Sequence, residues 1–303
     1  MHLLPTGEAA GVRVLISRQG SALRLITHPD HGRLAGMLCE QWGNSAFASP
    51  AHRDALLTAA TYHDDGWSEL DGRPMFNAEA GRPAHFLEVP LPETIAPYRT
   101  GVEEVYRRDM LAGALVSMHW AGLYRTRWGL QDGEPVGHPA TDDIVSEQEQ
   151  RWGRALGETW GLRGRRSAFE ADAWHAYEIL QALDFISLAI CLIDPEALSQ
   201  EPGAGSVGPP VPTTLRSIDQ PPGGRTIPSV PVRCGGPYVD IALWVSEPMT
   251  VTLDPYPFAD RAGLAVEVPA RTIADDRHPS AEACADALRA APAQRVALRV
   301  VPR

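Results

Sequence analysis

Residues 168–193, AFEADAWHAYEILQALDFISLAICLI, decide how the rest of the chain is interpreted. The apolar pattern predicts a long helix that ends before Asp194-Pro195 and carries Asp184 near its middle. Its longest apolar run, residues 185–193, is too short for the roughly eighteen residues of a membrane span, so we expect none. An ionised carboxylate is costly to bury without a cation partner. Asp184 therefore indicates a metal ligand or, alternatively, an N-cap or an ion-paired core aspartate.

Further histidines and aspartates fall on or between other predicted helices. They are His31, His63-Asp64, His85 and His119. Their separations along the chain are tertiary, unlike those of a zinc finger. Imidazole with carboxylate suits iron, zinc or manganese, whereas thiolate-rich sites suit structural zinc. The set predicts a site for two metal ions, although His63-Asp64 with Asp65 is also typical of a polar helix end, and a lone loop histidine such as His85 is often on the surface.

Composition narrows the class of partner. The chain has 303 residues and a formal net charge of -11, which argues against binding to nucleic acid. Four cysteines without a CxxC pair, and no recognisable signal peptide, favour a reduced cytoplasmic setting. All 27 basic residues are arginine, which excludes Schiff-base, P-loop and lysine-base chemistry. We expect a small-molecule substrate, with a homodimer left open.

The order of predicted elements suggests two domains. Two short strands around Gly20 come first. A helix from about Asp30 to Trp42 and a second helix, with Ser49 as N-cap and Pro50 at its first position, follow. A long loop carries His85, and later helices carry His119 and Asp184. We expect a mainly α fold: a helical bundle with a small N-terminal β element (residues 1–198), a Gly/Pro-rich linker (199–214) and a small α+β domain (215–303).

The order of the ligand candidates resembles the HD-domain superfamily of helical metalloenzymes, over roughly residues 28–195. The whole chain also resembles an uncharacterised bacterial family whose domain has no assigned function. The stretches that carry this second resemblance are HPDHGRLAG (28–36), HDDGW (63–67), MHWAGLY (118–124) and DPYPF (254–258). Within the superfamily, the set is similar to those of myo-inositol oxygenase, the phosphonate-cleaving oxygenases and the dinuclear phosphohydrolases. The short interval between Asp64 and His85 favours the oxygenases.

The superfamily resemblance implies a role for each ligand candidate. Asp64 would bridge two ions, His31, His63 and Asp184 would complete the first, and His85 and His119 would bind the second. The residue four positions after His63 is Trp67, where many relatives have a substrate-contacting lysine or histidine. The catalytic set that we expect is His63, Asp64, Trp67 and Arg125.

Other residues near the ligands are candidates for substrate contact or support. Without lysine, any phosphate clamp must be arginine, and Arg33, Arg125 and Arg127 are close to ligands in sequence. Trp67 and Trp120 are candidates for a pocket wall. Asp30 either orients an imidazole or caps a helix.

The resemblance predicts a dinuclear metalloenzyme, with iron favoured over manganese or zinc, that oxidises a small polar molecule with dioxygen. A metal-dependent phosphohydrolase is the alternative. A non-catalytic metal-binding or sensory module is a third reading.

Overall fold

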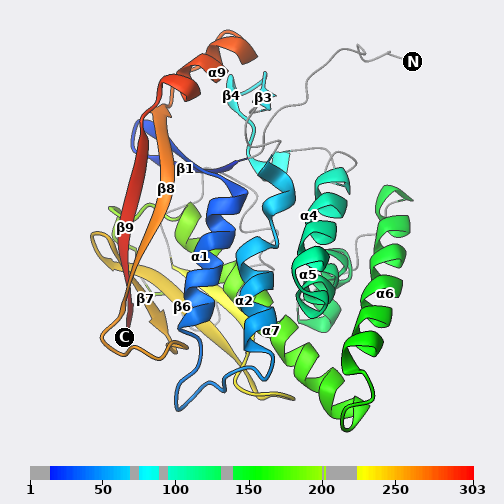
Figure 1. Ribbon diagram of the computed structural model, residues 1–303. Coiled ribbons are helices and arrows are strands. Elements are labelled where there is room, and N and C mark those ends of the chain that lie inside the picture. The colour runs from blue at the N-terminus through cyan, green and yellow to red at the C-terminus, as the bar shows by residue number, and fades with distance from the viewer. Residues whose placement is uncertain (1–13, 69–74, 89–94, 131–138, 200, 203–223) are drawn as a thin grey trace.

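The computed structural model describes residues 14–68, 75–88, 95–130, 139–199, 201–202 and 224–303. Its elements in chain order are β1 (Leu15–Gln19), β2 (Ala22–Ile26), α1 (His28–Glu40), α2 (Arg53–Tyr62), η1 (Asp65–Trp67), β3 (Phe76–Asn77), β4 (Arg82–Pro83), η2 (Phe86–Glu88), α4 (Ile95–Arg108), α5 (Met110–Leu123), η4 (Thr126–Gly129), α6 (Pro139–Trp160), α7 (Arg166–Leu192), β5 (Arg225–Pro231), β6 (Tyr238–Glu247), β7 (Thr250–Asp254), β8 (Leu264–Ala274), α9 (Ala281–Ala290) and β9 (Ala293–Pro302). In Figure 1 a large curled sheet lies on one side, and most of the helices are gathered on the other.

The sheet is the larger of the two in the described part of the chain. It has seven strands in the order β1-β2-β8-β9-β7-β6-β5, and all neighbours are antiparallel except β7 and β9. Its buried face packs against α1 and α7, which belong to the same hydrophobic core as α2 and α5. The helices therefore lie against a sheet and do not form a bundle by themselves.

The expected fold class is wrong for this reason. We expected a mainly α, HD-domain-like bundle with a small N-terminal β element and a separate small α+β unit. Instead, β2 pairs residues 22–25 with residues 271–274 of β8, which joins the N-terminal hairpin to the C-terminal strands. A two-stranded hairpin is only marginally stable alone. Its partner lies almost at the other end of the chain, so local sequence patterns do not identify it.

The predicted linker at residues 199–214 lies largely outside the described residues. The division into two domains stays a prediction, although strands from both sides of that linker share one sheet.

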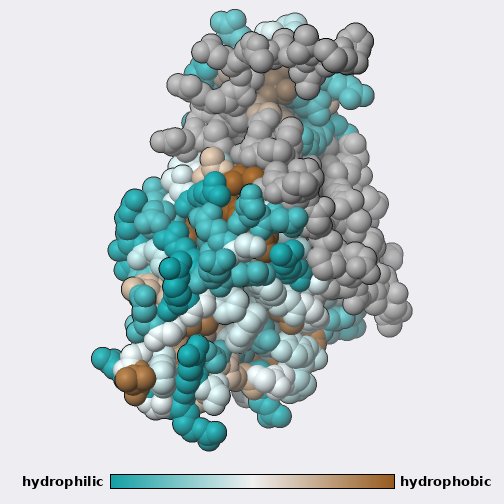
Figure 2. Space-filling model, turned by 90° about the vertical axis from the view of Figure 1, so that its right-hand side faces the viewer, coloured by the Kyte–Doolittle hydropathy of each residue, from teal (hydrophilic) through white to brown (hydrophobic). Residues whose placement is uncertain are grey.

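The predicted long helix is confirmed as α7. It is apolar and long enough to span a membrane by composition, but 89% of its apolar window is buried inside the protein. Core helices of soluble proteins have the same character. In Figure 2, which views the molecule from the right-hand side of Figure 1, the coloured atoms are mainly hydrophilic or intermediate, with small, separate hydrophobic patches.

Two helix starts differ from the sequence prediction. Helix α1 begins earlier than Asp30, because the side chain of Thr27 caps it by accepting a hydrogen bond from Asp30 N. Helix α2 begins at Arg53, so Ser49 is not its N-cap. The end of α2 is as expected, since His63 is its C-cap residue and Asp64 follows directly.

A buried arginine donates hydrogen bonds to carbonyl groups at the C-terminus of α7. Arg24 on β2 is 4% exposed, and its Nη2 donates hydrogen bonds to the carbonyl oxygens of Cys191, at 3.2 Å, and Ile193. The last carbonyls of a helix have no partner within the helix, and a cation there also interacts favourably with the helix dipole. Arg24 therefore ties the N-terminal hairpin to the helix that carries Asp184.

We predict that Arg24→Met lowers the free energy of unfolding by about 2–3 kcal/mol, because it removes charged hydrogen bonds and leaves buried carbonyls without donors. Chemical denaturation measures this change. The control is Arg18→Met, which removes the ion pair with Asp275 on the surface of the same hairpin and should cost at most about 1 kcal/mol. Equal losses in the two variants would contradict the role of Arg24.

Candidate metal centre

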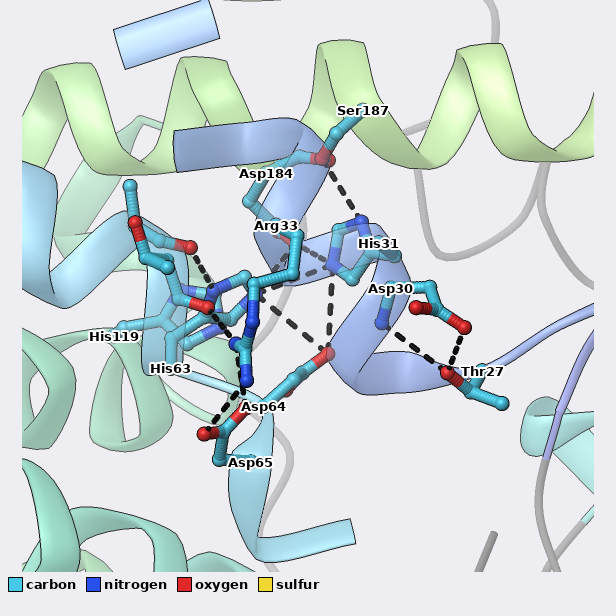
Figure 3. Close-up of polar contacts among 12 residues, drawn as sticks. Thr27, Asp30, His31, Arg33, His63, Asp64, Asp65, His119, Asp184 and Ser187 are labelled. Carbon is cyan, nitrogen blue, oxygen red and sulfur yellow. Dashed lines mark hydrogen bonds and ion pairs between the residues drawn. The ribbon is translucent and has the colours of Figure 1, made fainter. Parts of the chain in front are cut away.

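Four side chains from three parts of the fold converge in the core. His31 lies in the first turn of α1, His63 and Asp64 follow α2, and Asp184 lies on α7. All four are at most 6% exposed. Figure 3 shows them pointing toward one another, and it shows Ser187 next to the other ring nitrogen of His31.

Two glycines let α1 approach α2 closely enough for this convergence. A Cβ on Gly36 would lie 2.2 Å from Thr61 Oγ1, and a Cβ on Gly32 would lie 2.9 Å from Thr61 O. The spacing of these glycines, one helical turn apart, places both on the face toward α2. The sequence HGRLAG therefore provides both a ligand candidate and the close helix contact that brings it to His63.

The distances among the ligand atoms match those of a metal site. His31 Nε2 lies 3.2 Å from His63 Nε2 and 3.3 Å from Asp184 Oδ1, and His63 Nε2 lies 3.6 Å from the same oxygen. Two ligands of a tetrahedral ion with bonds of about 2.1 Å are about 3.4 Å apart. In the part of the chain that the structure describes, one candidate ligand atom from each of three residues lies within 4.8 Å of the other two. These residues are His31, His63 and Asp184, which we call the triad.

The Nδ1 atoms of His31 and His63 both form hydrogen bonds that leave the Nε2 atoms without a proton when the rings are neutral. His63 Nδ1 lies 2.9 Å from Ala60 O, which only accepts, so Nδ1 carries the proton. Ser187 Oγ donates to Asp184 O, so it accepts from His31 Nδ1 at 2.9 Å. A hydrogen bond at one ring nitrogen sets the tautomer and leaves the other nitrogen free for a metal. Two lone pairs and a carboxylate thus face a common point.

These groups need a positive charge between them. Burial lowers the pKa of His31, but hydrogen bonds and charges from Asp184 and Asp64 outweigh it and raise that pKa to about 9. Burial raises the pKa of Asp64, but the neighbouring histidines lower it to about 2. The raised pKa of His31 and the lowered pKa of Asp64 both indicate that the centre favours a positive charge. A metal ion would satisfy both imidazoles and the carboxylates at once, so the donor set fits a metal.

Asp64 adds a second carboxylate next to this triad. Its Oδ2 lies 3.4 Å from His31 Nε2 and 3.6 Å from His63 Nε2. Its Oδ1 is buried and has no hydrogen-bond partner among the described residues. Asp64 is therefore available either to the same ion or to a neighbouring one.

His119 lies beside His63, with ring centroids 5.2 Å apart, but its hydrogen bonds differ. Arg127 donates to Gln181 Oε1, and this fixes the amide so that Gln181 Nε2 donates to His119 Nδ1 at 2.8 Å. The neutral His119 ring then carries its proton on Nε2. Burial lowers the pKa of His119 to about 3, so the ring stays neutral. In this arrangement His119 offers an N–H to its surroundings. His119 lies outside the group of His31, His63 and Asp184, and its role as a ligand stays a prediction.

His85 is held by a different set of neighbours. Its backbone N–H donates to Glu88 Oε2, and Glu88 also pairs with Arg82. The ring of His85 packs on Phe86, which contacts the ring of His28. His85 is buried but lies outside the triad, so its role as a second-ion ligand stays a prediction.

The two tryptophan candidates line the surroundings of the centre. Trp67 stacks on His28 with centroids 4.9 Å apart, and Trp120 stacks on Tyr98 at 3.5 Å while its edge meets His119. Together these rings form an aromatic wall next to the ligands. Trp67 is 3% exposed and Trp120 is 6% exposed, so both rings lie in the core.

Of the remaining candidates, Arg33 and Asp30 stabilise segments next to the ligands, and Arg125 forms an ion pair with another helix. Arg33 forms a two-fold ion pair with Asp65, at 2.7 and 3.1 Å, and so fixes the turn that follows Asp64. Asp30 accepts from Thr27 Oγ1 at 2.6 Å and belongs to the cap of α1. Arg125 pairs with Glu149 on α6, at 3.3 Å.

Arg127 reaches the centre directly. Its Nη2 lies 3.4 Å from Asp184 Oδ2, so it contacts the triad carboxylate.

The residues missed by the sequence analysis share α7 with Asp184. Gln181 and Ser187 lie three residues before and after Asp184, on the same face of the helix. Polar residues at this spacing in an apolar helix were the signal that would have identified them. The sequence analysis also did not single out His28, which lies one turn before His31 and is buried.

Comparison with known proteins gives a family but no activity. The model of a family described as "Protein of unknown function (DUF3891)" matches residues 14–275. No curated protein and no solved structure matches the chain. The match agrees with the expected likeness to an uncharacterised family, whereas the HD-domain superfamily is not confirmed.

We predict that Ser187→Ala weakens metal binding by about 10- to 100-fold, because His31 loses the partner that fixes its tautomer. Titration of the chelator-treated protein with metal measures this affinity. Ser117→Ala is the control, since Ser117 is equally buried but bonds to Gln148 and Tyr106. An unchanged affinity in Ser187→Ala would show that Ser187 does not orient His31.

Proposed function

The chain belongs to the DUF3891 family of proteins of unknown function, and because that description states no activity, we propose from its buried centre that the protein is a metal-dependent enzyme. The metal would be held by His31, His63 and Asp184. One observation supports this most strongly. Two imidazole Nε2 atoms, which carry no proton when the rings are neutral, face each other and a carboxylate inside the core. Three hydrogen-bond acceptors that face one another in a core are unfavourable without a cation between them.

The donor set favours iron and oxidation. Two histidines with one carboxylate are typical of non-haem iron(II) enzymes that use dioxygen. Iron in such a site supplies one-electron redox chemistry and open positions for a substrate. We propose that the reaction is the oxidation of a small polar molecule.

Residues around the triad support such chemistry. Neutral His119 presents its Nε2 proton as a hydrogen-bond donor. Arg127 pairs with Asp184 and thereby holds this carboxylate in place. The aromatic wall of Trp67, Tyr98 and Trp120 keeps the surroundings apolar. Electrostatic interactions with a substrate are stronger where water is excluded.

Asp64 supports a second candidate function, metal-dependent phosphoester hydrolysis. Its unpartnered Oδ1 is available to bridge to a second ion, as the likeness to dinuclear phosphohydrolases implies. Two ions held by one bridging carboxylate are typical of enzymes that activate water for in-line displacement at phosphorus.

We predict that the purified protein retains at least one metal ion per chain, and that Asp184→Asn loses it. The substitution keeps the size of the side chain and removes the charge that the triad depends on. Elemental analysis measures the content. Asp172→Asn, the same change on the same helix outside the centre, should retain the metal. Full metal in Asp184→Asn would refute the proposed site.

Metal content, dioxygen uptake and phosphate release separate the candidates. Retained iron together with dioxygen consumption on addition of a substrate supports the oxidative enzyme. In protein loaded anaerobically with iron and partly reduced, a spin-coupled electron paramagnetic resonance signal would indicate a second iron ion. Zinc or manganese retained without iron, together with release of phosphate from phosphoesters, supports the hydrolase. Stoichiometric metal with neither reaction would favour a binding module.

A further inference from the structure

An exposed, arginine-rich turn joins α6 to α7, and we call residues 160–166 the basic turn. Residues 161–168 are all exposed, and the turn is the lowest part of the ribbon in Figure 1. The stretch RWGRALGETWGLRGRR (151–166) contains five arginines and a single acidic residue, Glu158. The whole chain has a formal net charge of -11. This stretch is therefore positive in a protein that is otherwise acidic.

Most of these arginines have no acidic partner. Arg163 and Arg165 form no ion pair among the described residues, whereas Arg166 pairs with Glu170 at 2.7 Å. Arg154, near the end of α6, is also exposed and has no ion pair in the described part of the chain. A guanidinium group recognises phosphate through several N–H donors in one plane. Three such groups at the end of the α6–α7 pair are therefore available to an anionic surface.

An apolar side chain lies among these arginines. Leu162 is 80% exposed, compared with 61% for Leu198, another exposed leucine. Its φ is 60°, in the left-handed region that favours glycine. Leu162 therefore adds backbone strain without burying its side chain, and strain of this kind is typical of functional sites.

Trp160 lies at the start of the basic turn. Its Nε1 donates to Gly164 O at 3.3 Å, and the guanidinium of Arg166 lies 6.0 Å from the centre of its ring. The side chain is only partly buried. Tryptophan is enriched where the apolar layer of a membrane meets water, because its ring is amphipathic. The turn thus combines an exposed leucine and an indole with several cationic groups.

We propose that the basic turn binds the surface of a membrane that contains anionic phospholipids. The guanidinium groups of Arg154, Arg163 and Arg165 contact lipid phosphates, and Leu162 inserts into the apolar layer beneath them. Anionic lipids attract clusters of basic residues, and the burial of an apolar side chain strengthens the attachment. The arginines alone would suit a nucleic acid equally well, whereas the exposed leucine favours a lipid surface. This binding does not depend on the proposed enzymatic function.

The first test is co-sedimentation of the full-length protein with two kinds of vesicle. One kind contains phosphatidylcholine alone, and the other contains phosphatidylcholine with phosphatidylglycerol, which is anionic. We expect binding to the anionic vesicles that weakens as salt is added, and binding at least about ten-fold weaker to phosphatidylcholine alone. Equal binding to both kinds, or binding to neither, would overturn the proposal. Binding to single-stranded RNA but not to anionic vesicles would overturn it in favour of a nucleic-acid site.

Two variants test the residues. Leu162→Ser should weaken binding to anionic vesicles by about ten-fold, because the inserted apolar group is lost. Arg163→Gln combined with Arg165→Gln should weaken it by about 30-fold, because each basic residue near an anionic surface strengthens binding. These side chains are exposed, so the melting temperature should stay unchanged, which separates lost binding from misfolding.

The matched controls lie elsewhere on the surface. Leu198→Ser replaces another exposed leucine, and Arg295→Gln replaces an exposed arginine on β9. Both controls should bind anionic vesicles as the unmodified protein does. Normal binding by the two basic-turn variants, or equal losses in the controls, would refute the site.

Discussion

The burial of the Asp184 carboxylate is the constraint on which the rest of the structure depends. The side chain lies on an apolar helix that packs against both the sheet and the other helices. Groups on both sides of this carboxylate compensate its charge. His31 and His63 approach one oxygen, and Arg127 approaches the other. The Arg127 guanidinium compensates part of the negative charge, and a metal ion held by the imidazoles would compensate the rest.

The packing of α7 explains why this compensation is possible. Arg24 of the N-terminal hairpin closes the C-terminal end of α7, and the hairpin is itself held by β8. The sheet therefore fixes the axis of α7 with respect to α1, which begins directly after β2. Close contact between α1 and α2 at two glycines then sets the distance from His31 to His63. The geometry of the centre is thus a consequence of strand pairing as much as of helix packing.

Arg127 contacts both the carboxylate of the centre and the amide that orients His119. One edge of its guanidinium donates to Gln181 and Asp184, and its Nε has no hydrogen-bond partner among the described residues. Gln181 in turn sets the tautomer of His119. One face of α7 therefore carries the ligand carboxylate together with the two polar groups that orient His31 and His119.

The sequence by itself determined the long helix with Asp184, the helices that carry His31 and His119, and the position of His63 and Asp64 at a helix end. These features follow from local periodicity and from the cost of burying charge. Only the tertiary structure decided that the terminal strands form one sheet, that His85 lies outside the triad, and that Gln181 and Ser187 set the histidine tautomers. The physical reason is that strand pairing and hydrogen-bond direction depend on contacts between segments far apart in the chain, which no local pattern contains.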